Sequence, residues 1–270
     1  MVNGKKVRIT TLEKKKSAGE KIVMLTAYDY PTARILDEAG IDAILVGDSL
    51  GPAILGYETE IPVTLNDMIH HCKAVSRGAQ HAFLIGDMPF MSYKISSEQA
   101  LRNCAKVVQK GGVEAVKLEG GAEIGKTVVA VVNAGIPVMG HIGFTPQSVH
   151  QIGGPRIQGR TETSRARLLD DAKMLEESGV FALVLEAMLP DIATEITEAL
   201  TIPTIGIGAG IACDGQVLVL ADILNLFFGK TPRLAKQYAD LKGQITKAVV
   251  AFMEEVKSGK FPDKEHTYET

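Results

Sequence analysis

Two opposite charges lie close together in an otherwise apolar stretch of the chain. Residues 114–119 read Glu-Ala-Val-Lys-Leu-Glu, and two glycines follow them. In an extended strand alternate side chains point to the same face, so Lys117 and Glu119 share one face. Burying a charge is unfavourable unless the charge is paired or binds a metal. These two residues could take part in catalysis at the carboxyl end of a strand, or they could form a structural ion pair.

Polar side chains also end four other short apolar runs. They are Asp48, Asp87, His141 and Glu186. In barrels and open α/β sheets, the carboxyl ends of parallel strands meet at one edge, where chemistry takes place. We therefore expect these four residues to lie near Lys117 and Glu119, although the sequence separates them widely.

Three of these residues suggest a metal site. Asp48, Asp87 and Glu119 supply hard oxygen donors, with no cysteine close to them in the sequence. Such donors suit Mg²⁺ or a similar ion, which keeps some of its waters and accepts substrate oxygens. Taken singly, Asp48 and Asp87 could instead be N-caps or turn residues, because each follows a glycine.

Glu186 is a candidate general base. Only apolar residues precede it in its run, and an apolar setting makes a carboxylate a stronger base. The alternative is a pairing with an arginine or lysine across the rim. His141 could position a substrate oxygen, or it could be a hydrogen-bonded core residue.

Eight short apolar segments are predicted as strands, at residues 21–26, 43–47, 82–86, 114–119, 137–141, 182–186, 203–207 and 222–226. Helices are predicted at residues 31–38, 64–77, 97–109, 122–133, 163–178, 191–200 and 237–257. This alternation is typical of a (β/α)₈ TIM barrel of about 250 residues. An open doubly wound sheet is the alternative, but here glycine-rich turns follow several strands rather than only the first. We see no linker and expect residues 1–270 to form a single barrel domain.

The composition limits the class of protein. A net charge of −3 over 270 residues argues against electrostatic binding to nucleic acid or to anionic membranes. The three cysteines are widely spaced and form no CxxC pair, which predicts a reducing compartment without disulfides or a zinc site. No apolar run is long enough to span a bilayer, and no signal peptide is recognisable. We therefore expect a cytoplasmic protein.

Several segments carry distinctive motifs. They include Val46-Gly-Asp-Ser-Leu-Gly51, Gly86-Asp-Met-Pro-Phe90, Val116-Lys-Leu-Glu-Gly-Gly121, Gly140-His-Ile-Gly-Phe-Thr-Pro-Gln147 and Ile205-Gly-Ile-Gly-Ala-Gly210. In order and spacing, the chain from about residue 5 to 265 resembles the 3-methyl-2-oxobutanoate hydroxymethyltransferase (ketopantoate hydroxymethyltransferase) family. The resemblance implies a barrel of the phosphoenolpyruvate/pyruvate type. It also implies synthesis of ketopantoate, for pantothenate and coenzyme A, with 5,10-methylenetetrahydrofolate as the one-carbon donor.

The resemblance also implies roles for individual residues. Asp48, Asp87 and Glu119 match the family's Mg²⁺ ligands. The positions that hold the oxo acid correspond to Asp48, Ser49, Asp87 and Lys117, and Glu186 matches the proton acceptor. A homo-oligomer is implied as well, in the form of a homodecamer built from paired subunits.

These residues fit one mechanism, which we state as a hypothesis. The metal and Lys117 would stabilise charge on the keto oxygen while Glu186 removes the proton from C3 of the oxo acid. Two other functions remain open on sequence grounds. One is a related lyase or mutase, which would need a catalytic cysteine in a rim loop. The other is a metabolite-binding barrel without catalysis, which would be expected to lack part of the acid and lysine set.

Overall fold

The computed structural model describes residues 5–229 and 232–268. The chain divides into two compact units, Met1–Val219 and Leu220–Thr270. That residues 1–270 form one domain stays a prediction. Within the part of the chain that is described, no helix combines the length and the apolar character needed to cross a membrane.

The first unit is a closed barrel of eight parallel strands, which pair in the order in which they occur in the chain. The strands are β1 Ile22–Thr26, β2 Ala43–Val46, β3 Phe83–Asp87, β4 Ala115–Glu119, β5 Val138–Gly143, β6 Ala182–Glu186, β7 Thr204–Ile207 and β8 Gly215–Leu218. β8 pairs with β1 and closes the barrel. The predicted (β/α)₈ fold is confirmed.

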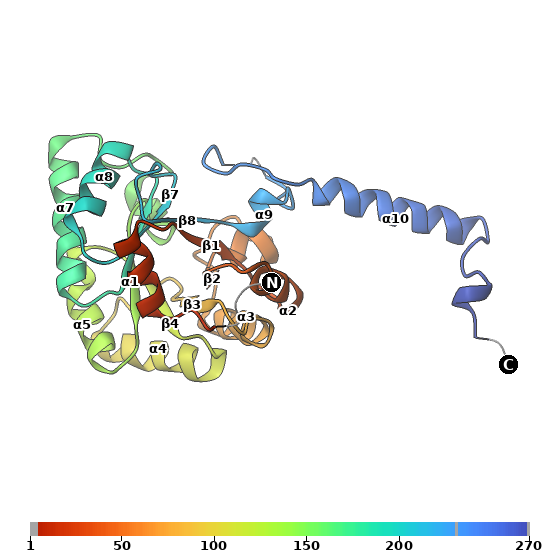
Figure 1. Cartoon of the computed structure of the whole chain (residues 1–270), viewed down its shortest axis with the longest axis horizontal. Helices are drawn as coiled ribbons and strands as arrows, with labels where there is room; N and C mark the ends of the chain where they lie inside the picture. The colour runs from red at the N-terminus through yellow and green to blue at the C-terminus, as the bar shows by residue number, and fades with distance from the viewer. Residues whose placement is uncertain (1–4, 230–231, 269–270) are drawn as a thin grey trace. The chain divides into compact units, whose positions relative to one another are not determined.

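Helices cover the outside of this barrel (Figure 1). The α-helices of the first unit are α1 Ile9–Ala18, α2 Tyr30–Ala39, α3 Leu65–Gly78, α4 Ser97–Gly111, α5 Gly125–Asn133, α6 Val149–Ile152, α7 Glu162–Glu177 and α8 Pro190–Ala199. Short turns of other helix types are η1 Gly51–Leu55, η2 Ala122–Ile124 and η3 Pro146–Ser148. Side-chain caps fix several starts. Thr64 caps α3 as predicted, because its hydroxyl accepts the backbone N–H of Asp67 at 3.2 Å.

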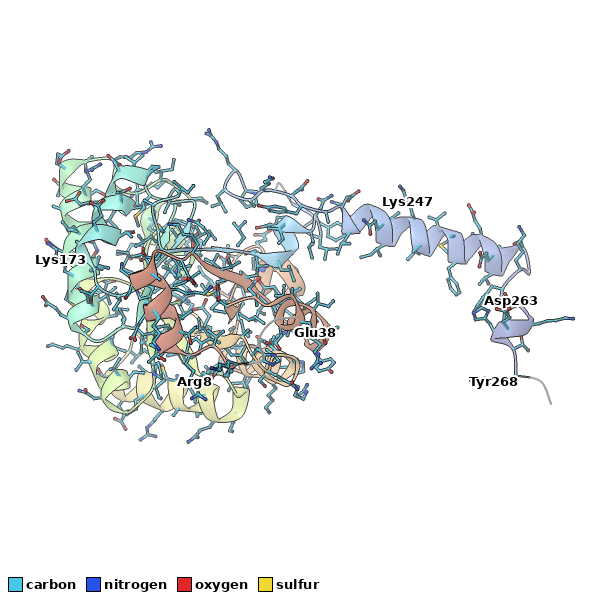
Figure 2. All side chains as sticks on the ribbon, in the orientation of Figure 1. Arg8, Glu38, Lys173, Lys247, Asp263 and Tyr268 are labelled. Carbon is cyan, nitrogen blue, oxygen red and sulfur yellow. The ribbon has the colours of Figure 1, made fainter. Side chains whose placement is uncertain are left out.

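Alternate residues of each strand fill the barrel interior with buried side chains. Figure 2 shows the described side chains on the ribbon. The interior cluster includes Ile85 of β3, Ala115 of β4 and Val184 of β6. Because side chains alternate between faces, the residue two positions further along each of these strands also points inward. The alternation of side chains that fills the core therefore also directs Asp87, Lys117 and Glu186 into the barrel.

The amino ends of the strands are closed by α1 and the segment before it. Leu12 of α1 joins the interior cluster. Three lysines from this region pair with acids that lie just before strands, in the ion pairs Lys6–Glu114 at 2.6 Å, Lys15–Asp42 at 2.6 Å and Lys16–Asp214 at 2.8 Å.

The predicted eighth strand was wrong. Residues 222–226 do not form a strand, and they overlap the short helix α9, Leu220–Ile223. The strand is instead Gly215–Leu218, whose Gly215 pairs with Ile22 of β1. A Cβ at Gly215 would collide with the backbone oxygen of Ile22, so the close approach needs glycine. A glycine and an exposed glutamine make this strand less apolar than the segment that follows it.

The second unit contains α9, α10 Leu241–Lys257 and the short turn η4 Lys264–His266. The terminal helix was predicted to begin at residue 237, but it begins at Leu241. Asp240 sets that start, because its side chain accepts the backbone N–H of Gly243 at 3.1 Å.

Candidate active site

The predicted rim residues converge at the carboxyl ends of β2 to β6. Asp87, Glu119 and Glu186 are the last residues of their strands, and Asp48 comes directly after Gly47 at the end of β2. The members of this set other than Glu186 are buried: Asp48, Asp87, Lys117, Glu119 and His141. Glu186 keeps 16% of its side chain exposed, so it faces both the cluster and solvent.

Lys117 lies at the centre of a buried ionic network. Its Nζ atom lies 2.8 Å from Asp87 Oδ2 and 3.5 Å from Glu119 Oε1. The same Nζ lies 3.2 Å from Nδ1 of His141. Lys117 and Glu119 do form an ion pair, but it belongs to a larger cluster and is not the isolated structural pair that was the alternative.

The three acids are arranged so that they could share one cation. Asp48, Asp87 and Glu119 each offer an oxygen, and these oxygens all lie within 4.8 Å of one another. Among the described residues, Asp87 Oδ1 is buried and has no hydrogen-bond partner. When ionised, three carboxylates beside one ammonium leave two negative charges, which a divalent cation would balance. The donor set is all oxygen, as Mg²⁺ prefers, so the residues present fit such an ion.

Burial and mutual repulsion perturb the acids. Burial raises the pKa of Asp48 well above its usual value, and the carboxylates of Asp87 and Glu119 raise it further. Burial also raises the pKa of Asp87. At Glu119 burial acts in the same direction, but the opposing effects of Lys117 and His141 prevail and lower its pKa to about 2. Binding of a proton or a cation would reduce the repulsion between these carboxylates and so stabilise the metal-free protein.

The ammonium form of Lys117 is favoured by its neighbours. Burial would lower the pKa of Lys117, but the adjacent Asp87 and Glu119 carboxylates outweigh burial and raise it. The metal-free site therefore favours the positively charged form of Lys117. In that form Lys117 can donate hydrogen bonds to an anionic oxygen.

Glu186 is held beside His141 by a constrained backbone. Glu186 Oε2 lies 3.2 Å from His141 Nε2, a contact without the angle of a good hydrogen bond. The backbone oxygen of Glu186 accepts the N–H of Phe144 at 2.9 Å. Ala187 has a φ of 46°, a left-handed conformation that is rare for a residue other than glycine. Strain of this kind is often found beside functional residues, where surrounding contacts maintain it.

Two site residues were not identified from the sequence. Gln147 is buried, and its amide nitrogen donates to Asp48 Oδ2 at 2.8 Å. Tyr93 is also buried, and its hydroxyl accepts the backbone N–H of Glu119 at 3.1 Å. Both lie in loops, where no periodic pattern reveals burial. Gln147 falls within one of the recognised motifs, which was the one available signal.

Two more residues lie at the edge of the site. Ser49 follows Asp48, and its hydroxyl lies 2.8 Å from the hydroxyl of Tyr28. Glu60, in the loop after η1, is half-buried. Burial raises the pKa of Glu60 to about 7, and the charges of Glu119 and Glu186 act in the same direction.

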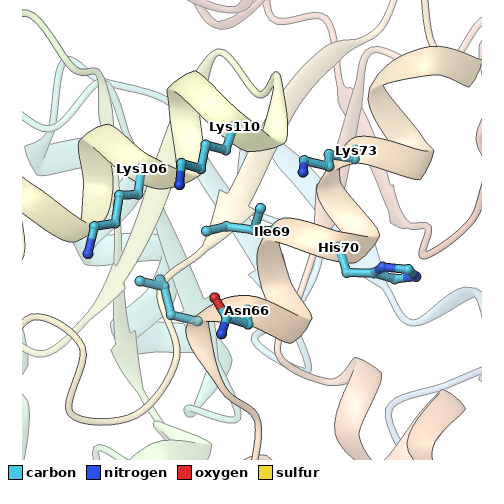
Figure 3. A pocket seen from close by; sticks show the side chains of 7 residues that line it. Asn66, Ile69, His70, Lys73, Lys106 and Lys110 are labelled. Atoms are coloured by element: carbon cyan, nitrogen blue, oxygen red, sulfur yellow. The ribbon is translucent and has the colours of Figure 1, made fainter.

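A separate cavity of about 400 Å³ lies between α3 and α4 (Figure 3). His70 and Lys73 of α3 and Lys106 and Lys110 of α4 are among the residues that line it. The cavity contains none of the predicted site residues. Its lysines are exposed, so their ammonium groups stay hydrated, and we do not place the active site there.

The cysteines do not resemble catalytic nucleophiles. Cys72, Cys104 and Cys213 are all buried and free. Burial raises the pKa of Cys72 and of Cys104 to about 12, which favours the unreactive thiol. This argues against a lyase or mutase that depends on a loop cysteine.

The acid cluster, the lysine and the neighbouring glutamate occur in a chain whose sequence matches a known family. The family model described as ketopantoate hydroxymethyltransferase matches residues 6–264. The chain belongs to the ketopantoate hydroxymethyltransferase family. The resemblance inferred from the motifs, and with it the enzyme class, is confirmed.

Individual relatives agree with this family assignment. A 3-methyl-2-oxobutanoate hydroxymethyltransferase from Thermoanaerobacter sp. (strain X514) is 55% identical over 263 residues, which cover 97% of this chain and 96% of the relative. Among solved structures, phosphonopyruvate hydrolase aligns with a TM-score of 0.63 and 11% identity, covering 98% of this chain and 92% of that one. The structure of 2,3-dimethylmalate lyase, a PEP mutase/isocitrate lyase superfamily member, aligns with a TM-score of 0.59 and 21% identity, covering 96% and 91%. These structural likenesses support the (β/α)₈ barrel fold.

Proposed function

We propose that this protein transfers a hydroxymethyl group from 5,10-methylenetetrahydrofolate to 3-methyl-2-oxobutanoate. The product would be 2-dehydropantoate (ketopantoate), used for pantothenate and coenzyme A biosynthesis. The family and the close relative support the reaction. The structural observation that supports it best is the contact of His141 with both Lys117 and Glu186, which joins the ionic cluster to a partly exposed carboxylate.

Asp48, Asp87 and Glu119 would hold Mg²⁺ in this proposal. A bound divalent ion supplies Lewis-acid polarisation to the carboxylate and keto oxygens of a 2-oxo acid. The partnerless Oδ1 of Asp87 and the excess of negative charge support this assignment. Asp48, Ser49, Asp87 and Lys117 would surround the oxo acid.

Lys117 would stabilise the charge that grows on the keto oxygen. It has donors only, and its neighbours keep it protonated. In a buried site a fixed charge of this kind is effective, because water does not have to reorganise during the reaction. Asp87 holds the ammonium group at 2.8 Å and so fixes its position.

Glu186 would remove the proton from C3 of the oxo acid. The electrons of that C–H bond form the C2–C3 double bond, and the keto oxygen takes up the negative charge. C3 then forms a bond to the methylene carbon of the folate, and both bonds from that carbon to the folate nitrogens are broken in the overall reaction. Water supplies the oxygen of the new hydroxymethyl group, and tetrahydrofolate leaves with its two nitrogens protonated by the proton from C3 and one proton of the water. His141 Nε2 lies 3.2 Å from Oε2 of Glu186, so Oε1 would be the oxygen that accepts the proton.

The test is deuterium exchange at C3 of 3-methyl-2-oxobutanoate in D₂O, followed by NMR without folate. Wild type with Mg²⁺ should exchange the C3 hydrogen. Glu186→Gln should reduce exchange by at least about 10²-fold, because it removes the base. Glu195→Gln changes an exposed glutamate of α8 and should exchange like wild type. Undiminished exchange in Glu186→Gln would remove Glu186 from the role of base.

Removal of the metal provides a second arm of this test. Treatment with a chelator should abolish both exchange and turnover, and return of Mg²⁺ should restore them. Full turnover in a metal-free sample would contradict the assignment of Asp48, Asp87 and Glu119 as ligands.

A further inference from the structure

Gln147 uses both N–H donors of its side-chain amide, and its amide oxygen, in contacts at the acid cluster. It lies in η3, directly after β5, and is buried. Its Nε2 atom donates to Asp48 Oδ2 and to the backbone oxygen of Met88, each at 2.8 Å. Its Oε1 atom lies 2.9 Å from the hydroxyl of Tyr93. Since the Met88 carbonyl can only accept, the orientation of the amide is fixed.

The backbone of Gln147 contacts a second acid. Its N–H donates to Glu119 Oε2 at 3.2 Å. Tyr93 extends the connection to Glu119, because its hydroxyl accepts the N–H of Glu119 at 3.1 Å. The single proton of that hydroxyl has two acceptors at 2.9 Å, Gln147 Oε1 and the carbonyl oxygen of Glu119. One loop residue therefore contacts two of the three acids that could hold the cation, through its side chain and through its backbone.

An amide suits this position for an electrostatic reason. A lysine or arginine would neutralise Asp48 and compete with a cation, whereas a carboxylate would add repulsion where the pKa of Asp48 is already raised by its neighbours. A neutral donor orients Asp48 Oδ2 and leaves its other oxygen for a metal. Partners of this type, which orient a ligand without touching the metal, are typically worth 10- to 100-fold in affinity.

We propose that Gln147 is a positioning residue that holds Asp48 and Glu119 ready for a divalent cation, and that it couples the cation to the loop of residues 144–160. The inference rests on the metal site of the proposed function. Coupling is reciprocal, so a cation that fixes the two acids must also stabilise the loop that Gln147 anchors. The same contacts predict an effect on affinity and an effect on loop dynamics.

The test of affinity is a Mn²⁺ titration of the metal-free protein, followed by electron paramagnetic resonance. Gln147→Met keeps the length of the side chain and removes both donors, so its Mn²⁺ dissociation constant should rise about 10- to 100-fold. Ser148→Ala changes the next residue of the same loop, whose hydroxyl makes none of these contacts, and should stay within about twofold. Denaturant unfolding without metal measures the stability of each variant. A Gln147→Met affinity within twofold of wild type would overturn the inference.

A measurement on wild type covers the case in which Gln147→Met does not fold. Hydrogen exchange of residues 144–160, with and without Mn²⁺, should show slower exchange on binding, with the Gln147 amide among the protected sites. Unchanged exchange across this loop would overturn the inference. If wild type binds no Mn²⁺ in the titration, the metal site of the proposed function fails. If wild type and Gln147→Met bind it equally, only the role of Gln147 fails.

Discussion

The charged residues at the two ends of the barrel differ in how completely they are paired. At the amino end, acids that precede strands accept backbone N–H groups and also pair with lysines. Asp42 accepts the N–H of Val23 at 2.9 Å, and Asp214 accepts that of Thr204 at 2.8 Å. Each of these acids has its own lysine within 2.8 Å. Charge and hydrogen bonding are satisfied within the chain, as expected for groups that stabilise the fold.

At the carboxyl end, three buried acids share a single lysine. Asp87 has an oxygen without a partner, and Asp48 is crowded by its neighbours. The fold alone gains nothing from this arrangement, because uncompensated buried charge is destabilising. The contrast indicates that the amino end maintains the barrel, while the carboxyl end is built to bind something that the chain does not supply. This division agrees with the general behaviour of TIM barrels.

The largest expected effect is at Asp48. Asp48→Asn should lower activity by about 10³-fold or more, because it removes a charged ligand from the proposed metal site. It should leave the metal-free protein equally or more stable, because it relieves repulsion with Asp87 and Glu119. Steady-state kinetics and denaturant unfolding in chelator measure the two quantities. A large loss of stability with unchanged activity would show that Asp48 stabilises the fold, as the acids of the amino end do, and does not serve a binding site.

The second-largest expected effect concerns the position of Glu186. Gly143 has a φ of 100°, and a Cβ there would overlap the backbone oxygen of Glu186. Gly143→Ala should displace Glu186 and lower the rate of C3 exchange by about 10²-fold, since small misplacements at a reacting group are costly. Gly153→Ala is the matched control, with a φ of 81° and nothing within 4 Å of the new methyl group. Equal rates for the two variants would show that the backbone position of Glu186 is not critical.

Substitutions at the amino end of the barrel should change the stability of the protein but not its activity. Asp214→Ala should lower the free energy of unfolding by about 2 kcal/mol, because the N–H of Thr204 loses its acceptor. Asp214→Asn keeps an acceptor and loses only the ion pair with Lys16, so its loss should be below about 1 kcal/mol. Both folded variants should retain activity within about twofold. A strong loss of activity in either would show that the two ends are not separate in function.

The smallest expected effect is a pH dependence at Glu60. Because the pKa of Glu60 is raised in the folded protein from 4.5 to about 7, the folded state binds more protons than the unfolded state between these values. Stability is therefore lost as pH rises through this window. Glu60→Gln should be more stable than wild type at pH 8, by roughly 1 kcal/mol after allowance for solvent screening, and equal to it near pH 4.5.

Denaturant unfolding in chelator at the two pH values measures this difference. Glu58→Gln, which changes an exposed acid in the same loop, is the matched control. A Glu60 variant that matches wild type at both pH values would show that neither burial nor the charges of Glu119 and Glu186 raise the pKa of Glu60.

Local pattern was enough to predict the strands that carry the site. Lys117 and Glu119 could be assigned to one face because alternation within a strand depends only on neighbouring residues. β8 was missed because its sequence is determined by a contact with a distant residue. Its glycine is required by close packing against β1, and this long-range contact leaves no apolar signal in the strand itself.

The residues that orient the acids were also beyond local pattern. Gln147 and Asp48 are 99 positions apart, and Gln147 and Tyr93 are 54 apart. Nothing in either loop indicates that a polar side chain is buried there, because the burial arises only when the barrel closes. The charged residues of the site could thus be predicted from the sequence, but the neutral residues that orient them could not.

The most direct test of the account is anomalous diffraction from a crystal soaked with Mn²⁺ and 3-methyl-2-oxobutanoate. The account predicts one strong peak among the carboxylates of Asp48, Asp87 and Glu119, with the oxo acid between that peak and Glu186. A peak elsewhere with these carboxylates bare, or an oxo acid whose C3 lies out of reach of Glu186, would contradict it.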